Sequence, residues 1–384
     1  MRRNIEHKGD PDDMVRAGED MPEISSEIVA IKPSSAMDRL RSLSATSRLE
    51  EMEKNITMDR YIIPEMALDG QITLFYAKPN TGKTLFFLKF IIDGISNGTI
   101  QAKDVFYVNA DDSYKGLFVK AKIAKQHGFN MISPAEAGIN PADVIRLLDQ
   151  LSESEEVRGK IIFIDTLKKF ADMMNKKSQA HFFHVLRKLG TRDVTVIIAG
   201  HANKHLNTDG EMIYEGTSDT MNDIDCAYSM HRISDAADPK QVVEFRREKD
   251  RGSVVPRVVY RYRKTNSESY IDIVNSIERV DDGVAQELSL AAKHDEIREK
   301  YEPVLLFVTD LLSAGKLIQT DIIKAYTGGD HIKEEVTKSG FTKGLRNLTG
   351  IAWSTARDRS NNNALVYELI GSANDYRRAK GGRG

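Results

Sequence analysis

One short segment, residues 77–84, constrains this chain more than any other part of its sequence. It reads Ala-Lys-Pro-Asn-Thr-Gly-Lys-Thr, follows the apolar run 72–76, and opens a stretch with helical periodicity at 84–96. A tight loop between a buried strand and a helix points successive backbone N–H groups inward, and the helix N-terminus adds partial positive charge. The segment therefore predicts a phosphate-binding loop.

The residue types at the end of this loop match the chemistry of a nucleoside triphosphate. Lys83 is expected to reach the terminal phosphates as a catalytic residue, and the Thr84 hydroxyl to coordinate Mg²⁺, so ATP and Mg²⁺ are the predicted cofactors. Glycine is usual at the first position, where this chain has Ala77, so the backbone there must adopt a conformation that alanine can reach. A chance Gly-Lys-Thr at a helix start is the alternative, and the flanking strand and helix argue against it. The predicted nucleotide-binding residues are Ala77, Lys78, Pro79, Asn80, Thr81, Gly82, Lys83, Thr84 and Leu85.

Asp165 closes another apolar run, residues 160–165. A carboxylate at the carboxyl end of a parallel strand can bind the water shell of a magnesium ion, and the loop would place Thr84 beside it. An aspartate that only forms a turn is the alternative. Because the phosphate-binding loop accompanies it, we predict that Asp165 is catalytic and that Asp165 and Thr84 hold the metal.

Two further carboxylates, Asp111 and Asp112, follow the apolar run 105–109. An acidic residue at this edge of the sheet can orient the water that attacks the γ-phosphate, and we assign this catalytic role to Asp111. The alternative is that Asp112 caps the helix beginning at Tyr114 while Asp111 is simply solvated.

Short apolar runs alternate with amphipathic stretches between Tyr61 and Tyr262, which predicts an α/β fold with a mostly parallel sheet flanked by helices. Parallel strands are covered on both faces and therefore read as continuous apolar runs. The predicted strands are 72–76, 105–109, 160–165 and 194–200, followed by 226–231, 241–248 and 254–262 at the far edge. The predicted helices between them are 84–96, 114–127, 141–151 and 178–189.

The organisation of the chain predicts four segments. Residues 1–55 are charged and rich in Ser, Pro and Met, and are expected to form a mobile arm. Residues 56–275 are expected to form the ATPase domain and residues 284–372 a small winged-helix-like domain, in which helices at 319–326 and 332–348 precede two extended pieces. Residues 373–384 form a basic, Gly-rich tail.

Composition narrows the location and the partners. The chain carries 55 basic and 57 acidic residues, so its net charge of −2 creates no overall field toward nucleic acid or membrane, and any DNA contact must be local. Cys226 is the only cysteine, which excludes an internal disulfide and fits a reducing compartment. No run resembles a signal sequence or approaches the ~18 apolar residues of a membrane span. We therefore expect a cytoplasmic protein with no membrane partner.

The order of these features resembles the RecA-like P-loop ATPases (AAA family ATPases), and among them the branch of RepA-type and DnaB-type hexameric replicative helicases. The resemblance covers about residues 61–262. It rests on the Ala-initiated loop, the acidic pair after the second strand, and the segments Ile-Ile-Phe-Ile-Asp-Thr-Leu at 161–167 and Gly-His-Ala-Asn-Lys at 200–204. It implies a RecA-like fold and a homo-oligomeric ring, such as a hexamer.

The resemblance also implies roles for residues outside the loop. His201, which ends the fourth strand, would sense the γ-phosphate. Lys249 and Arg251 look like the Lys-x-Arg pair that family members project onto a neighbouring subunit's nucleotide, which makes turnover depend on assembly. Residues 215–219 resemble the loop that faces the ring's channel. The alternatives are a buried or loop histidine for His201 and an exposed turn of mixed charge for Lys249 and Arg251.

Two function classes remain open on sequence grounds. The first is an oligomeric, DNA-dependent ATPase, helicase-like, that acts on single-stranded or duplex DNA in replication or recombination of a mobile element or phage. The second is a nucleotide-gated loader, adaptor or DNA-bound regulator without strand-separating activity. No N-terminal primase-binding helical domain is expected before the ATPase domain, and the supposed DNA loops lack a dense run of Lys and Arg, so the second class stays open beside the first. The C-terminal domain also carries cations that could contact DNA phosphates. They could equally form a solvated face or bind a partner protein such as a replication or recombination factor. These cations are Lys338, Lys343, Arg346, Arg357 and Arg359.

Overall fold

The computed structural model describes residues 36–42, 44, 46, 49, 60–170, 176–206, 212–216, 218–235, 237–265, 267–329, 336–372 and 376. The chain divides into two compact units, residues 1–58 and 59–384. In its described part the first unit contains helix α2 (Ala36–Ser42). Most of the expected mobile arm at 1–55, and all of the basic tail at 373–384 except residue 376, lie outside the described residues.

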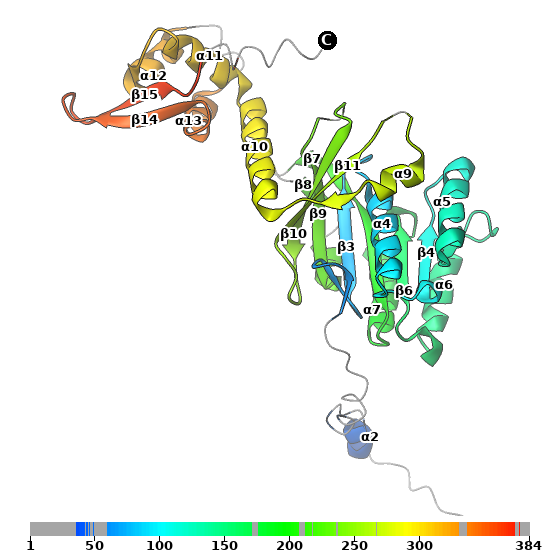
Figure 1. Cartoon of the computed structure of the whole chain (residues 1–384). Coiled ribbons are helices and arrows are strands. Elements are labelled where there is room, and N and C mark those ends of the chain that lie inside the picture. The colour runs from blue at the N-terminus through cyan, green and yellow to red at the C-terminus, as the bar shows by residue number, and fades with distance from the viewer. Residues whose placement is uncertain are drawn as a thin grey trace, which may run out of the picture. The chain divides into compact units, whose positions relative to one another are not determined.

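The larger unit is built on one extended sheet that is mostly parallel at its centre (Figure 1). Among the described residues ten strands belong to it, in the order β12-β11-β10-β9-β3-β7-β6-β4-β5, with β8 paired to β7. The six strands from β9 to β5 run parallel, whereas β8, β10, β11 and β12 are antiparallel additions. The strands are β3 (Ile72–Ala77), β4 (Val105–Asn109), β5 (Asn130–Ile132), β6 (Ile161–Asp165), β7 (Thr195–Leu206), β8 (Met212–Tyr214), β9 (Cys226–Arg232), β10 (Lys240–Lys249), β11 (Arg257–Arg263) and β12 (Glu278–Arg279). A separate pair, β1 (Tyr61–Ile63) and β2 (Ala67–Leu68), precedes them.

Helices cover both faces of this sheet, which explains the unbroken apolar runs of its central strands. On one face α4 (Lys83–Ser96) and α5 (Tyr114–His127) pack in the same core as Phe75 of β3. On the other, α6 (Pro141–Leu151) and α7 (Lys176–Gly190) share a core with Leu74, the preceding residue of the same strand. The predicted fold class, α/β with a mostly parallel sheet flanked by helices, is confirmed.

Strand β7 differs from its predicted extent of 194–200. It continues to Leu206 and forms a hairpin with β8, in which Ala202 pairs with Tyr214. The polar residues after Gly200 had indicated the end of a buried strand, but an antiparallel partner satisfies their backbone groups and lets the strand continue. His201 therefore lies within a strand rather than at its end.

After α9 (Tyr270–Asn275) and the long helix α10 (Asp282–Lys300), the chain forms a small domain with its own core. It contains α11 (Glu302–Leu312), β13 (Leu317–Ile318), α12 (Gln319–Gly328), α13 (Lys338–Asn347), β14 (Trp353–Asp358) and β15 (Ala364–Leu369). The strands form an antiparallel sheet in the order β13-β15-β14. This is the predicted set of helices followed by a two-stranded hairpin. The helix expected at 332–348 begins at Lys338, capped by Thr337, and residues 332–335 lie outside the described residues.

None of the helices in the described residues has both the length and the apolar character needed to cross a lipid bilayer.

Candidate nucleotide-binding site

The loop that joins β3 to α4 has the backbone geometry of a phosphate cradle. Gly82, at the N-cap of α4, has φ 106°, a left-handed conformation that only glycine adopts without strain. Asn80 also has positive φ, and the Thr81 hydroxyl donates to the Lys78 carbonyl at 2.9 Å, which closes the loop on itself. Ala77 is the last residue of β3 and pairs with strands on both sides, so alanine meets no conformational obstacle there.

The predicted metal ligands meet at one carboxylate oxygen. The Thr84 hydroxyl donates to Oδ2 of Asp165 at 2.5 Å, although 81 residues separate the two in sequence. The buried Tyr107 hydroxyl donates to the same oxygen at 2.7 Å. Asp165 is 6% exposed at the carboxyl end of β6, so its position is set by the strand and by these two donors.

This donor set suits a magnesium ion that is shared with a nucleotide. Mg²⁺ prefers hard oxygen ligands and usually takes only one or two from protein, with phosphates and waters completing the shell. Thr84 and Asp165 supply a hydroxyl and a carboxylate oxygen side by side. In the described ranges no three His, Cys, Asp or Glu side chains gather into a metal site of their own.

Lys83 carries a charge that its surroundings do not neutralise directly. Its side chain lies at the start of α4, the residue is 8% exposed, and no described carboxylate lies within ion-pair distance of its ammonium. Burial lowers the pKa of Lys83, while the charges of Asp165 and Asp111 act in the opposite direction. A buried cation without a direct partner is costly, so this position is suited to an anion that enters from outside.

The acidic pair after β4 separates into two environments. Asp112 accepts hydrogen bonds from Asn109 and the buried Lys120, and these two donors fix the position of its carboxylate. Asp111 is exposed, and its Oδ1 lies 3.2 Å from the Lys169 ammonium. The alternative in which Asp112 caps α5 is wrong, because the Ser113 side chain does so by accepting from the Gly116 N–H.

His201 lies directly beside the loop. In the parallel pairing of β7 with β3, His201 is level with Ala77, and its side chain is half-buried. Burial lowers its pKa below 6.5, and the nearby positive charge of Lys83 acts in the same direction. The imidazole is therefore mainly neutral at pH 7, when one ring nitrogen can donate and the other can accept a hydrogen bond.

Lys249 and Arg251 lie at the other end of the sheet. Lys249 donates to the Met221 and Asn222 carbonyls, and Arg251 pairs with Asp225 at 3.1 Å. The other oxygen of Asp225 accepts from the Ile72 N–H, at the start of β3, whereas the loop follows the end of that strand. Five residue steps along β3 separate these ends by about 16 Å. The structure thus does not bring this pair to the chain's own candidate site.

Two residues of the site were missed by sequence reasoning. Tyr107 looked like an ordinary strand residue, and nothing in its local sequence marks its contact with Asp165. Arg232 donates to the Asn80 carbonyl and so braces the loop from β9, the strand beside β3. The predicted strand ended at His231, and an arginine immediately beyond it, at the same sheet edge as the loop, was the signal that could have found it.

Changing Tyr107 to Phe is expected to raise the Mg²⁺ concentration for half-maximal ATP hydrolysis several-fold, because Asp165 loses a donor that orients it. The measurement is a magnesium titration of ATPase rate at saturating ATP. Tyr228→Phe is the matched control, since its buried hydroxyl donates to the Val255 carbonyl instead. Equal titrations for both variants would show that Tyr107 has no orienting role.

Comparisons with known proteins leave the family open. No family model matches the chain, and no curated protein matches it. One solved structure, described as the RadB recombinase, is similar over 56% of this chain and 93% of its own chain, with 14% identity and a TM-score of 0.39. A likeness at this level carries no argument about function.

Proposed function

We propose that this chain is a RecA-like ATPase that binds ATP with Mg²⁺ and hydrolyses it. The observation that carries the proposal is the buried Lys83 ammonium, which has no described ion-pair partner and follows a left-handed glycine at a helix N-terminus. Next to it, Thr84 and Asp165 present two oxygens to a metal. Few functions other than binding a metal-complexed polyphosphate would use this combination.

In the proposed mechanism each residue has one task. The loop N–H groups and Lys83 bind the β- and γ-phosphates and stabilise the charge that develops there during cleavage. Thr84 and Asp165 hold the magnesium ion, which when bound neutralises phosphate charge. Asp111 orients the attacking water after leaving its exposed ion pair with Lys169. His201, beside Ala77, detects whether the γ-phosphate is present.

The proposal extends to an oligomer that acts on DNA in replication or recombination. Support comes from the position of Lys249 and Arg251, which lie away from the nucleotide site of their own chain. The family resemblance suggests that such a pair contacts the nucleotide of a neighbouring subunit. The second candidate is a nucleotide-gated loader, adaptor or DNA-bound regulator. The ion pair of Asp111 with Lys169 favours this candidate, because it engages the carboxylate that fast hydrolysis would need.

The test is the ATPase rate of the purified protein with and without single-stranded DNA, together with its mass in solution with ATP. Stimulation by DNA and a ring-sized mass are expected for the motor. Slow turnover that DNA does not change would favour the nucleotide-gated protein. Failure to bind ATP at all would contradict both.

A further inference from the structure

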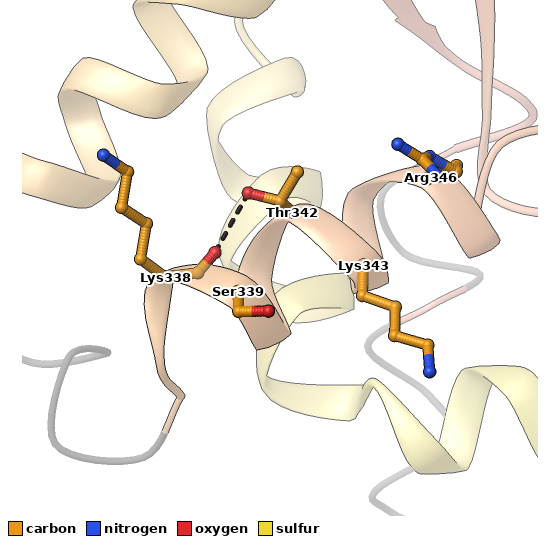
Figure 2. Close-up of a pocket in the computed structure, with 5 residues that line it drawn as sticks. All are labelled: Lys338, Ser339, Thr342, Lys343 and Arg346. Atoms are coloured by element: carbon orange, nitrogen blue, oxygen red, sulfur yellow. Dashed lines mark hydrogen bonds between the residues drawn. The ribbon is translucent and has the colours of Figure 1, made fainter. Parts of the chain in front are cut away.

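The C-terminal domain presents a basic surface on helix α13 that the proposed ATPase site does not use. Five side chains from successive turns of this helix line a hollow, and Figure 2 shows these side chains. The hollow has a volume of about 680 Å³, and its lining residues are Lys338, Ser339, Thr342, Lys343 and Arg346. All five are exposed, and α13 contains no acidic residue. We call these five residues the α13 basic face.

The cations of the α13 basic face differ from other lysines in the same domain. Lys316 pairs with Glu368 at 2.9 Å, and Lys324 pairs with Asp321 at 3.8 Å. Lys338, Lys343 and Arg346 form no ion pair with any described residue. The positive charge of the α13 basic face is therefore not cancelled by the described part of the domain, and remains available to a polyanion.

The opposite face of α13 fixes the helix in place. Phe341 and Leu345 are buried in the domain core, and the Leu345 carbonyl accepts from the buried Trp353 indole. A Cβ on Gly344 would come within 2.9 Å of the Tyr301 ring, so the helix packs closely at that position. The basic face is thus presented on a rigid element, which reduces the entropy lost on binding.

The residue types favour nucleic acid over a protein surface. The face has no apolar side chain, whereas protein interfaces concentrate aromatic residues at their centre. It places the Ser339 hydroxyl between the cations, and Thr342, whose hydroxyl donates to the Lys338 carbonyl, still offers an exposed polar group. Cations interleaved with small hydroxyl residues are what phosphate and base-edge contacts use.

The described residues of the same domain offer no exposed aromatic ring on which single-stranded bases could stack. Proteins that bind single-stranded DNA stack bases on exposed aromatic rings. In residues 301–329 and 336–372 every aromatic side chain is buried or half-buried. An α-helix with its side chains is about 10–12 Å across, which fits the major groove of B-DNA, about 12 Å wide.

We propose that the α13 basic face binds duplex DNA, with the helix lying in the major groove. This inference deepens the proposed function, on which it rests for DNA as the partner. It assigns duplex binding to the C-terminal domain. Duplex binding through this face requires neither ATP nor hydrolysis.

The test is fluorescence anisotropy of the full chain, without nucleotide, on a labelled 20-base-pair duplex and on a 20-nucleotide single strand. Lys338→Ala/Lys343→Ala is expected to weaken duplex binding about tenfold and to make the salt dependence less steep by about 2, since each lysine–phosphate contact contributes about 1. Lys316→Ala/Lys324→Ala removes the same charge from the same domain and is the matched control, expected to change neither quantity.

The outcomes separate this inference from the ATPase proposal. Equal duplex affinity for the two double variants would overturn the inference. It would also be overturned if the unmodified protein bound single strands as tightly as duplex and Lys338→Ala/Lys343→Ala lost both affinities equally. Lys83→Ala should bind duplex like the unmodified protein. If the protein does not hydrolyse ATP, and only Lys338→Ala/Lys343→Ala loses duplex affinity, the inference about the α13 basic face is supported and the proposed ATPase function is contradicted.

Discussion

Changing Lys83 to Ala is expected to lower the ATPase rate by a factor of about 100 to 1,000, the usual loss when a preorganised charge at a reacting phosphate or oxyanion is removed. Lys83 is 8% exposed and directly precedes Thr84, whose hydroxyl donates to Asp165. The measurement is steady-state phosphate release at saturating ATP and Mg²⁺. The same variant should also lose most of the rise in melting temperature that ATP causes, because stabilisation by a ligand follows its affinity for the folded state.

The control for this change lies six residues further along the same helix. Lys89 forms an i,i+4 ion pair with Asp93 and lies about 9 Å further along the helix axis than Lys83, so Lys89→Ala removes equal charge from α4 at a distance from the site. Lys89→Ala should keep the full rate. If Lys83→Ala hydrolyses ATP as fast as Lys89→Ala, the nucleotide site has been assigned to the wrong residues.

Changing Arg251 to Ala is expected to lower turnover by about 1,000-fold while ATP still binds, because a charge supplied by a neighbour acts mainly on the transition state. Arg251 lies at the amino end of β3 and cannot reach a phosphate at Lys83 of its own chain. Mixing Arg251→Ala with Lys83→Ala protein should partly restore the rate, since one variant then offers an intact loop and the other an intact arginine.

Arg187→Ala is the matched control for the effect on folding. Arg187 and Arg251 bind the same oxygen of Asp225, at 2.7 and 3.1 Å, so either variant removes one ion pair from that carboxylate. Only Arg251 is expected to be essential for turnover. Full activity of isolated monomers, or equal losses in the two variants, would contradict catalysis between subunits.

Arg251 and the loop that carries Lys83 lie at opposite ends of β3, which restricts how two subunits could share a nucleotide site. A head-to-tail contact joins two different surfaces and forms a closed ring when its rotation closes. Such a contact would bring the amino end of the sheet in one subunit toward the carboxyl end in the next. A two-fold dimer, which joins identical surfaces, would not supply Arg251 to the loop in this way.

The loop and the central strands could be predicted because their signals are local. Residues 77–84 combine a turn that requires glycine at position 82 with Lys83 and Thr84 in adjacent positions, and burial on both faces forces continuous apolar runs in β3, β4 and β6. The extent of β7 could not be predicted, because its continuation depends on pairing with β8. The different surroundings of Asp111 and Asp112 could not be predicted either, because Lys120, which donates to Asp112, lies on a later turn of α5.

The class of fold, the tight loop between β3 and α4 and the aspartate that closes β6 could all be predicted from the sequence, since each follows from periodicity or from residues adjacent along the chain. The hydrogen bonds of Tyr107 to Asp165, of Arg232 to Asn80 and of Arg251 to Asp225 became visible only in the folded chain. These contacts join residues 26 to 152 positions apart. They depend on which strands lie side by side in the sheet, and no local sequence pattern encodes that arrangement.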